Sequence, residues 1–193
     1  MRMRMPSNEK IALICEGAAE QAIMQLLLNN NDLKFKKEDL FYEEILRCRN
    51  GTTFAKKYLG SEFNFKVIIC RILDSKKERF SIPKEYATKI AKPEEGNGFA
   101  YNFFTRPEIE MVHILAHGDY DDFKNKCNRI KKGKLKPSQY VRENYKDLKN
   151  CKAYNENYQY WNTNYDVLKE ALIQYKRKSP NISGEYCIAD LLK

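Results

Sequence analysis

Long apolar runs are missing from this sequence, in which the longest is the segment from Ile11 to Cys15. A helix that crosses a bilayer needs about 20 predominantly apolar residues, so we expect no membrane-spanning segment and no membrane partner. The basic start, residues 1–6, is followed by polar residues instead of the apolar stretch of a signal peptide. The sequence therefore predicts a cytoplasmic protein.

Paired cysteine motifs are also missing. The six cysteines are widely spaced, and no Cys-x-x-Cys pair occurs, which argues against a zinc knuckle and a redox motif. The only histidines, His113 and His117, are four residues apart. They could clasp a transition metal with Asp119, Asp121 or Asp122, but no His-Glu-x-x-His frame surrounds them. Packing against a sheet, with the imidazole hydrogen-bonded, is the favoured interpretation.

Positive charge is plentiful. Lysine and arginine number 35 against 26 acidic residues, a net charge of +9, which favours encounters with phosphate groups. Residues 119–178 hold 15 of the basic and 8 of the acidic residues, and they are rich in tyrosine. This distribution predicts a nucleic acid, DNA or RNA, as the partner.

The hydrophobic pattern alternates between strands and helices. It predicts strands at 11–15, 40–48 and 66–73, an edge strand at 101–105, and helices at 19–28, 52–59, 107–117, 138–148 and 163–178. Such alternation is typical of an α/β fold with an open, mainly parallel sheet flanked by helices. We expect a core at 1–118, with a basic, tyrosine-rich helical extension at 119–193 packed on it.

Acidic residues follow two of the predicted strands. Glu16 follows the first buried strand and Asp74 follows the strand at 66–73, while Glu20 lies one turn into the next helix. Ligand groups collect beyond the carboxyl ends of parallel strands, and Mg²⁺ is often held by one or two carboxylates with waters and phosphates. The sequence indicates Glu16 and Asp74 as metal ligands. The alternative is that all three are solvated acids, with Glu20 favouring the helix start.

Two segments resemble a known family. The opening Ile11-Ala-Leu-Ile-Cys-Glu-Gly-Ala-Ala-Glu20 and the downstream segment from Pro107 to His117 are similar in order and spacing to Toprim-fold proteins, especially RloB-like and OLD-type nucleases. The resemblance covers roughly residues 9–120. It implies a Toprim-like sheet, a Mg²⁺ or Mn²⁺ cofactor, and phosphodiester cleavage.

The same resemblance assigns roles. Glu16 and Glu20 would be the acids of the opening motif, Asp74 the first aspartate of an Asp-x-Asp strand end, and Glu110 and His117 the helix positions. Catalysis would rest on Glu16 and Asp74 as metal ligands, with Glu20 and Glu110 supporting them or acting as the base. Lys76 stands where the family has its second aspartate, so a cation replaces a ligand. Lys76 could instead hold a scissile phosphate, and the sequence leaves open whether the site is catalytic.

The basic segments supply candidate phosphate contacts, namely Lys76, Lys77, Arg129, Lys131, Lys132, Lys134 and Lys136. Several aromatic residues follow them: Tyr154, Tyr158, Tyr160, Trp161 and Tyr165. Aromatic rings beside cations suit single-stranded nucleic acid, on which bases stack. An aromatic core within a helical layer is an equal alternative.

Three functions fit these observations. The first is a Mg²⁺-dependent nuclease or nuclease-derived effector, in the setting of phage or mobile-element defence where its relatives by resemblance occur and where an ATPase partner could control it. The second is a non-catalytic Toprim-like module that binds nucleic acid or a partner. The third is an adaptor that works through the basic, tyrosine-rich part, and binding that is insensitive to salt would favour it.

Overall fold

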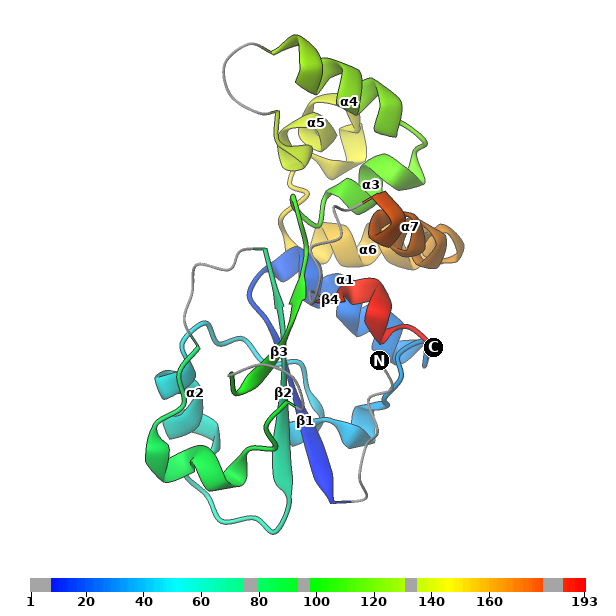
Figure 1. The fold of residues 1–193 in the computed structure, drawn as a ribbon. Helices are drawn as coiled ribbons and strands as arrows, with labels where there is room; N and C mark the ends of the chain where they lie inside the picture. Colours follow the sequence, from blue (N-terminus) through cyan, green and yellow to red (C-terminus); the bar gives the residue numbers. More distant parts are fainter. Residues whose placement is uncertain (1–7, 75–79, 94–97, 131–134, 179–185) are drawn as a thin grey trace.

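A computed structural model describes residues 8–74, 80–93, 98–130, 135–178 and 186–193 (Figure 1). The fold is α/β, with a four-stranded sheet in the order β1-β2-β3-β4 in which every pairing is parallel. The strands are β1 (Glu9–Cys15), β2 (Lys66–Leu73), β3 (Ala100–Phe104) and β4 (Tyr186–Cys187). Because all strands run the same way, their carboxyl ends meet at one edge of the sheet.

Helices flank this sheet. The α-helices are α1 (Ala18–Asn29), α2 (Gly51–Tyr58), α3 (Met111–Ala116), α4 (Tyr120–Arg129), α5 (Pro137–Asn144), α6 (Tyr154–Thr163) and α7 (Tyr165–Lys178). The 3-10 helices are η1 (Lys37–Asp39), η2 (Phe41–Glu43), η3 (Lys84–Lys89), η4 (Lys146–Leu148) and η5 (Ile188–Leu191). No helix of the described residues is long and apolar enough to cross a membrane.

The strands divide the core into two layers. Along β1, Ile11 and Leu13 belong to the larger cluster with α1, α3, α6 and α7, whereas Ala12 and Ile14 belong to a second cluster with α2. This division follows from the alternation of side chains between the two faces of a strand. β1 is therefore buried on both faces, as its continuous apolar run predicts.

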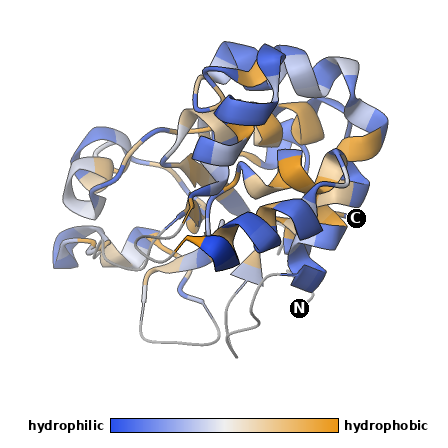
Figure 2. Ribbon diagram, turned by 90° about the horizontal axis from the view of Figure 1, so that it is seen from above, coloured by the Kyte–Doolittle hydropathy of each residue, from blue (hydrophilic) through white to orange (hydrophobic). Residues whose placement is uncertain are grey.

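The carboxyl edge of the sheet lies beneath a helical layer. In Figure 1, α6 lies beside α1 and α7 lies beside α3, while α4 and α5 lie farther from the sheet. Figure 2 shows hydrophilic residues on the outer turns of these helices and hydrophobic residues gathered inside the layer. The helices thus bury their apolar stripes against each other and against α1.

Several elements agree with the sequence prediction. The strand at 66–73 coincides with β2, the strand at 11–15 forms most of β1, and the helices at 19–28 and 52–59 correspond to α1 and α2. The helix predicted at 163–178 corresponds to α7. These segments have either a continuous apolar run or a strong helical period, which are the clearest local signals.

The strand predicted at 40–48 is wrong. The chain forms η1 and η2 around Leu40, and Tyr42 and Glu43 have φ values of 60° and 53°, in the left-handed region. Only isolated bridges join the segment to β1, at Leu40 and Leu46. Leu40, Phe41, Ile45 and Leu46 are buried because the loop packs on the sheet, and apolar residues of this kind also favour strands, so the segment imitates one.

Other boundaries also differ. β3 pairs with β2 on one side and with β4 on the other, so it is not an edge strand. The helix predicted from Pro107 begins at Met111, after turns in which the Met111 N–H donates to the Glu108 carbonyl. The helix predicted at 138–148 is shorter in the structure, because α5 ends at Asn144, where Tyr145 is extended, and the separate helix η4 follows.

The chain beyond residue 118 is not helical throughout. Residues 120–178 contribute α4 to α7, but the segment 186–193 returns to the sheet as β4 and η5. Leu192 forms a bridge with Leu33, and the Lys34 N–H donates to the Leu191 carbonyl. A two-residue strand has no detectable period, so the sequence pattern does not reveal β4.

Candidate active site

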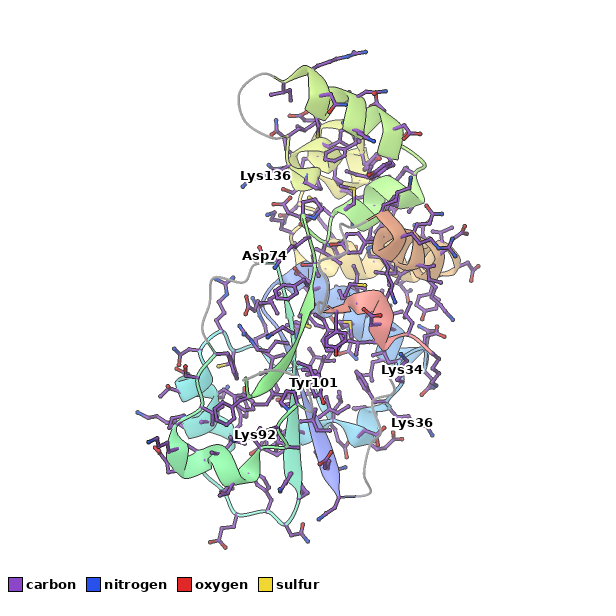
Figure 3. The ribbon with its side chains drawn as sticks, viewed as in Figure 1. Lys34, Lys36, Asp74, Lys92, Tyr101 and Lys136 are labelled. Carbon is purple, nitrogen blue, oxygen red and sulfur yellow. The ribbon has the colours of Figure 1, made fainter. Side chains whose placement is uncertain are left out.

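The candidate site lies at the carboxyl edge of the sheet. Glu16 directly follows β1, Asp74 follows β2, and Thr105 follows β3. Figure 3 shows Asp74 at the upper end of β2, below the helical layer that carries Lys136. The parallel topology therefore brings the ends of three strands to one place, where ligands of open α/β sheets usually bind.

Glu16 forms an ion pair inside this edge. Its carboxylate accepts a hydrogen bond from the Arg71 guanidinium of β2, and the two side chains are 10% and 2% exposed. Arg71 also donates to the Asn102 side chain at 3.3 Å and lies over the Phe80 ring, 4.5 Å from its centroid. A buried guanidinium thus balances the charge of Glu16.

Glu20 lies buried at the start of α1. The Thr105 hydroxyl donates to its carboxylate at 3.4 Å, and a Cβ built on Gly17 would lie 2.0 Å from the carboxylate oxygen Oε2. Glycine at position 17 therefore leaves the space that the Glu20 carboxylate fills. Burial, reinforced by the negative charge of Asp74, raises the pKa of Glu20.

Glu110 is the second buried acid of the site. It is 3% exposed and precedes α3. Burial raises its pKa to about 7, and the charges of Glu108 and Glu20 act in the same direction, while Lys152 opposes them. A carboxyl group with this pKa can both give and take a proton near neutral pH.

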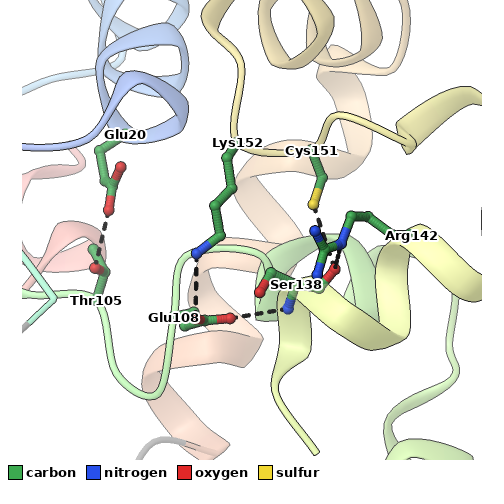
Figure 4. A network of polar contacts seen from close by, with 7 residues as sticks. All are labelled: Glu20, Thr105, Glu108, Ser138, Arg142, Cys151 and Lys152. Carbon is green, nitrogen blue, oxygen red and sulfur yellow. Dashed lines mark hydrogen bonds and ion pairs between the residues drawn. The ribbon is translucent and has the colours of Figure 1, made fainter.

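The helical layer adds a cation that the sequence pattern does not reveal. Lys152, in the connection before α6, pairs with Glu108 at 3.4 Å, and Glu108 also accepts the Ser138 N–H of α5 at 2.9 Å (Figure 4). These bonds lower the pKa of Glu108 despite its burial. The Lys152 side chain is 61% exposed, so its ammonium remains accessible from solvent. No motif surrounds Lys152, and only the fold brings it here.

The predicted site residues fall into two groups: Glu20, Asp74 and Glu110 form one group linked through Glu20, whereas Glu16 lies toward the other face of the sheet. Electrostatic coupling links Glu20 with Asp74 and with Glu110. By strand alternation, Glu16 continues the row of Ile14 toward α2, whereas Asp74 continues the opposite row. Among the described residues, no group of three or more His, Cys, Asp and Glu side chains is close enough to hold a metal ion by themselves.

The two histidines pack against α6 and not against the sheet. His113 Nε2 lies 2.9 Å from the Asn157 side-chain oxygen, and its ring stacks on Trp161. Burial lowers the pKa of His113 to about 4. His117 stacks on Tyr145 and is hydrogen-bonded to the Tyr160 hydroxyl at 3.0 Å. Both rings therefore join α3 to the helices above it.

The predicted phosphate contacts are placed only in part. Lys76, Lys77, Lys131, Lys132 and Lys134 lie outside the described residues. Arg129 and Lys136 are exposed, at the end of α4 and directly before α5. They flank the same connection, on the helical layer.

The aromatic residues of α6 and α7 serve largely as packing groups. Trp161 is fully buried, Tyr165 donates to Asp32, and Tyr154 stacks on Tyr158. This matches the alternative of an aromatic core within the helical layer. The base-stacking surface suggested by these aromatic residues is therefore not supported at Trp161.

Comparison with known proteins gives no match: no family model, curated protein or solved structure corresponds to this chain.

Proposed function

We propose that the chain is a Mg²⁺- or Mn²⁺-dependent nuclease, or an effector derived from one, that acts on DNA or RNA through a Toprim-like site. The observation that carries this proposal is the position of Glu20, a buried acid with a raised pKa beside Asp74 at the carboxyl edge of an all-parallel sheet. Asp74 is exposed, and a cation placed between it and the buried Glu20 carboxylate would offset the repulsion between the two negative charges.

The donor atoms suit such a cation. Glu20 and Asp74 offer carboxylate oxygens, which are hard ligands of the kind that Mg²⁺ prefers, and this ion usually keeps waters and phosphate oxygens as its other ligands. Two carboxylates are therefore sufficient as the protein ligands of this ion. Glu16 fits less well, because its carboxylate is bound to the Arg71 guanidinium. Glu20 and Asp74 would hold the ion, which would stabilise charge on a phosphate and lower the pKa of a bound water.

Neighbouring groups have complementary roles in this proposal. Glu110, with a pKa of about 7, would accept a proton from the attacking water. Lys152 carries an exposed ammonium within electrostatic range of Glu110 and Glu108, where a phosphate could bind. Arg129 and Lys136 would contact the nucleic acid farther along the helical layer.

The second candidate is a non-catalytic module of the same fold. The ion pair between Arg71 and Glu16 favours it, because the Arg71 guanidinium already binds the carboxylate that, by the resemblance, would be a metal ligand. Such a module would still bind nucleic acid through its cations. Its affinity would fall steeply with salt, and metal would not affect its binding.

Divalent metal is expected to stabilise the wild-type protein against heat. At a free Mn²⁺ concentration of 100 times Kd, the gain is about 2.7 kcal/mol, which corresponds to roughly 5–10 °C in Tm for a chain of this size. Glu20→Gln and Asp74→Asn should each abolish most of this shift, because each removes one of the two carboxylates. Differential scanning fluorimetry with and without Mn²⁺ measures it.

Two further variants sharpen this test. Gly17→Ala should fold with a loss of stability of about 1–2 kcal/mol, yet reduce the Mn²⁺ shift, because the added methyl group displaces the Glu20 carboxylate. Glu62→Gln, at an exposed position between α2 and β2, is the matched control and should keep the full shift. An equal shift in all these variants would refute the assigned site.

A further inference from the structure

A pocket opens between α3, α4 and α7, apart from the acidic site. Its volume is about 240 Å³. Met111, Tyr120, Phe123 and Tyr175 form its apolar walls. The pocket is open to solvent and its lining is mostly apolar, so an apolar group can enter it from water.

Two cations border this apolar hollow. Lys124 of α4 and Lys178 at the end of α7 line it, and both are exposed, so their ammonium groups lie toward solvent. The Lys178 nitrogen lies 4.1 Å from the centroid of the Tyr120 ring, which holds it at the opening. None of the described lining residues carries a carboxylate. The pocket is therefore apolar within and positive at its mouth.

The size limits what can enter. An engineered apolar cavity of about 150 Å³ binds benzene, so 240 Å³ accommodates a body of roughly ten non-hydrogen atoms by the same ratio. An apolar body desolvated by the walls, with an anionic end near the ammonium groups, matches both features. We propose that this pocket is a binding site for a small carboxylate with a compact aromatic or branched apolar body.

The pocket is independent of the proposed nuclease activity. Pro107 and Met111 line it, whereas the acids between them, Glu108 and Glu110, belong to the candidate active site. Binding can therefore be measured directly on the full chain, without any activity assay. Failure of the nuclease proposal would leave this inference intact, and the reverse also holds.

Titration of the full chain with 3-phenylpropionate, with the heat of binding measured by calorimetry, tests the proposal. The matched probes are 3-phenylpropanol and 3-phenylpropylamine, which keep the apolar body and change only the charge. We expect saturable binding of the carboxylate, at least tenfold weaker binding of the alcohol, and no measurable binding of the amine. Lys124→Gln and Lys178→Gln should each weaken carboxylate binding several-fold and leave the alcohol unchanged.

A variant that fills the hollow separates this site from other surfaces. Cys127→Leu adds apolar volume to the lining and should weaken both the carboxylate and the alcohol, while circular dichroism confirms an unchanged fold. Equal binding of the three probes, absence of saturable binding, or carboxylate binding that is insensitive to the lysine and Cys127 variants would each overturn the proposal.

Discussion

Glu16→Ala is expected to lower the free energy of unfolding by about 3–5 kcal/mol, because it leaves a charged guanidinium buried without its carboxylate. Arg71 is 2% exposed and keeps only the Asn102 side chain and the Phe80 ring as described partners of its positive charge. Removing one member of a buried ion pair costs far more than removing both. Urea denaturation followed by circular dichroism gives the difference.

The reciprocal variant should behave differently. In Arg71→Leu, the Glu16 carboxylate lies at a strand end and can turn toward water, so a smaller loss is expected. The double variant Glu16→Ala/Arg71→Leu should recover much of the stability lost in Glu16→Ala. Additive losses in the double variant would show that the ion pair contributes little to folding.

The same substitution bears on function. Arg71→Leu removes the guanidinium on the Glu16 side of the strand ends, whereas Glu20 and Asp74, on the opposite side, keep both carboxylates assigned to the cation. If Glu20 and Asp74 hold the metal, Arg71→Leu should therefore bind Mn²⁺ about as tightly as the wild type. Weaker binding would show that the pair itself organises the site.

Glu110→Gln is expected to change how stability depends on pH, by about 3 kcal/mol between pH 4.5 and 7. The pKa of Glu110 is raised to about 7 in the folded protein, so its contribution to stability is present below the unfolded pKa of about 4.5 and is lost as pH rises through 7. The pKa of His113 is lowered to about 4. Its contribution is present above about 6.5 and is lost as pH falls toward 4.

These two groups oppose each other in the wild type. From pH 4.5 to 6.5, Glu110 ionises in the unfolded chain but stays protonated in the folded protein, which lowers the stability as pH rises. His113 stays neutral in the folded protein and loses its proton only in the unfolded chain, which raises the stability. The two effects offset each other, so the wild-type profile should be comparatively flat. Glu110→Gln should become more stable as pH rises over this range, whereas His113→Gln should become less stable. Urea unfolding at steps across pH 4.5–7.5 measures the three slopes, and three parallel profiles would contradict these pKa shifts.

The sequence predicts the fold best where local signals are strong. β2 and α1 follow from a continuous apolar run and a helical period, and both are confirmed. The strand predicted at 40–48 is wrong because a loop that packs its apolar residues on a sheet resembles a strand in composition, and the left-handed backbone of Tyr42 and Glu43 has no signature in the sequence. β4 is not predicted, because this two-residue strand is defined by its pairing with the distant β3 and not by a local pattern.

The candidate site shows the same limit. Strand ends predict that Glu16 and Asp74 lie at one edge, but sequence alone does not say which face each occupies or that Arg71 binds Glu16. Lys152 reaches the site through packing between α1 and α6, which lie at least 125 residues apart in the chain. Chemistry that depends on long-range packing is therefore visible only in the structure.

The most direct measurement is cleavage of plasmid DNA, single-stranded DNA and tRNA in the presence of Mg²⁺ or Mn²⁺. We expect metal-dependent cleavage of at least one substrate by the wild type and by Glu62→Gln, with a loss of at least 100-fold in Glu20→Gln and Asp74→Asn. Absence of cleavage on every substrate, with nucleic-acid binding that survives both site substitutions, would contradict a catalytic role and favour the non-catalytic module.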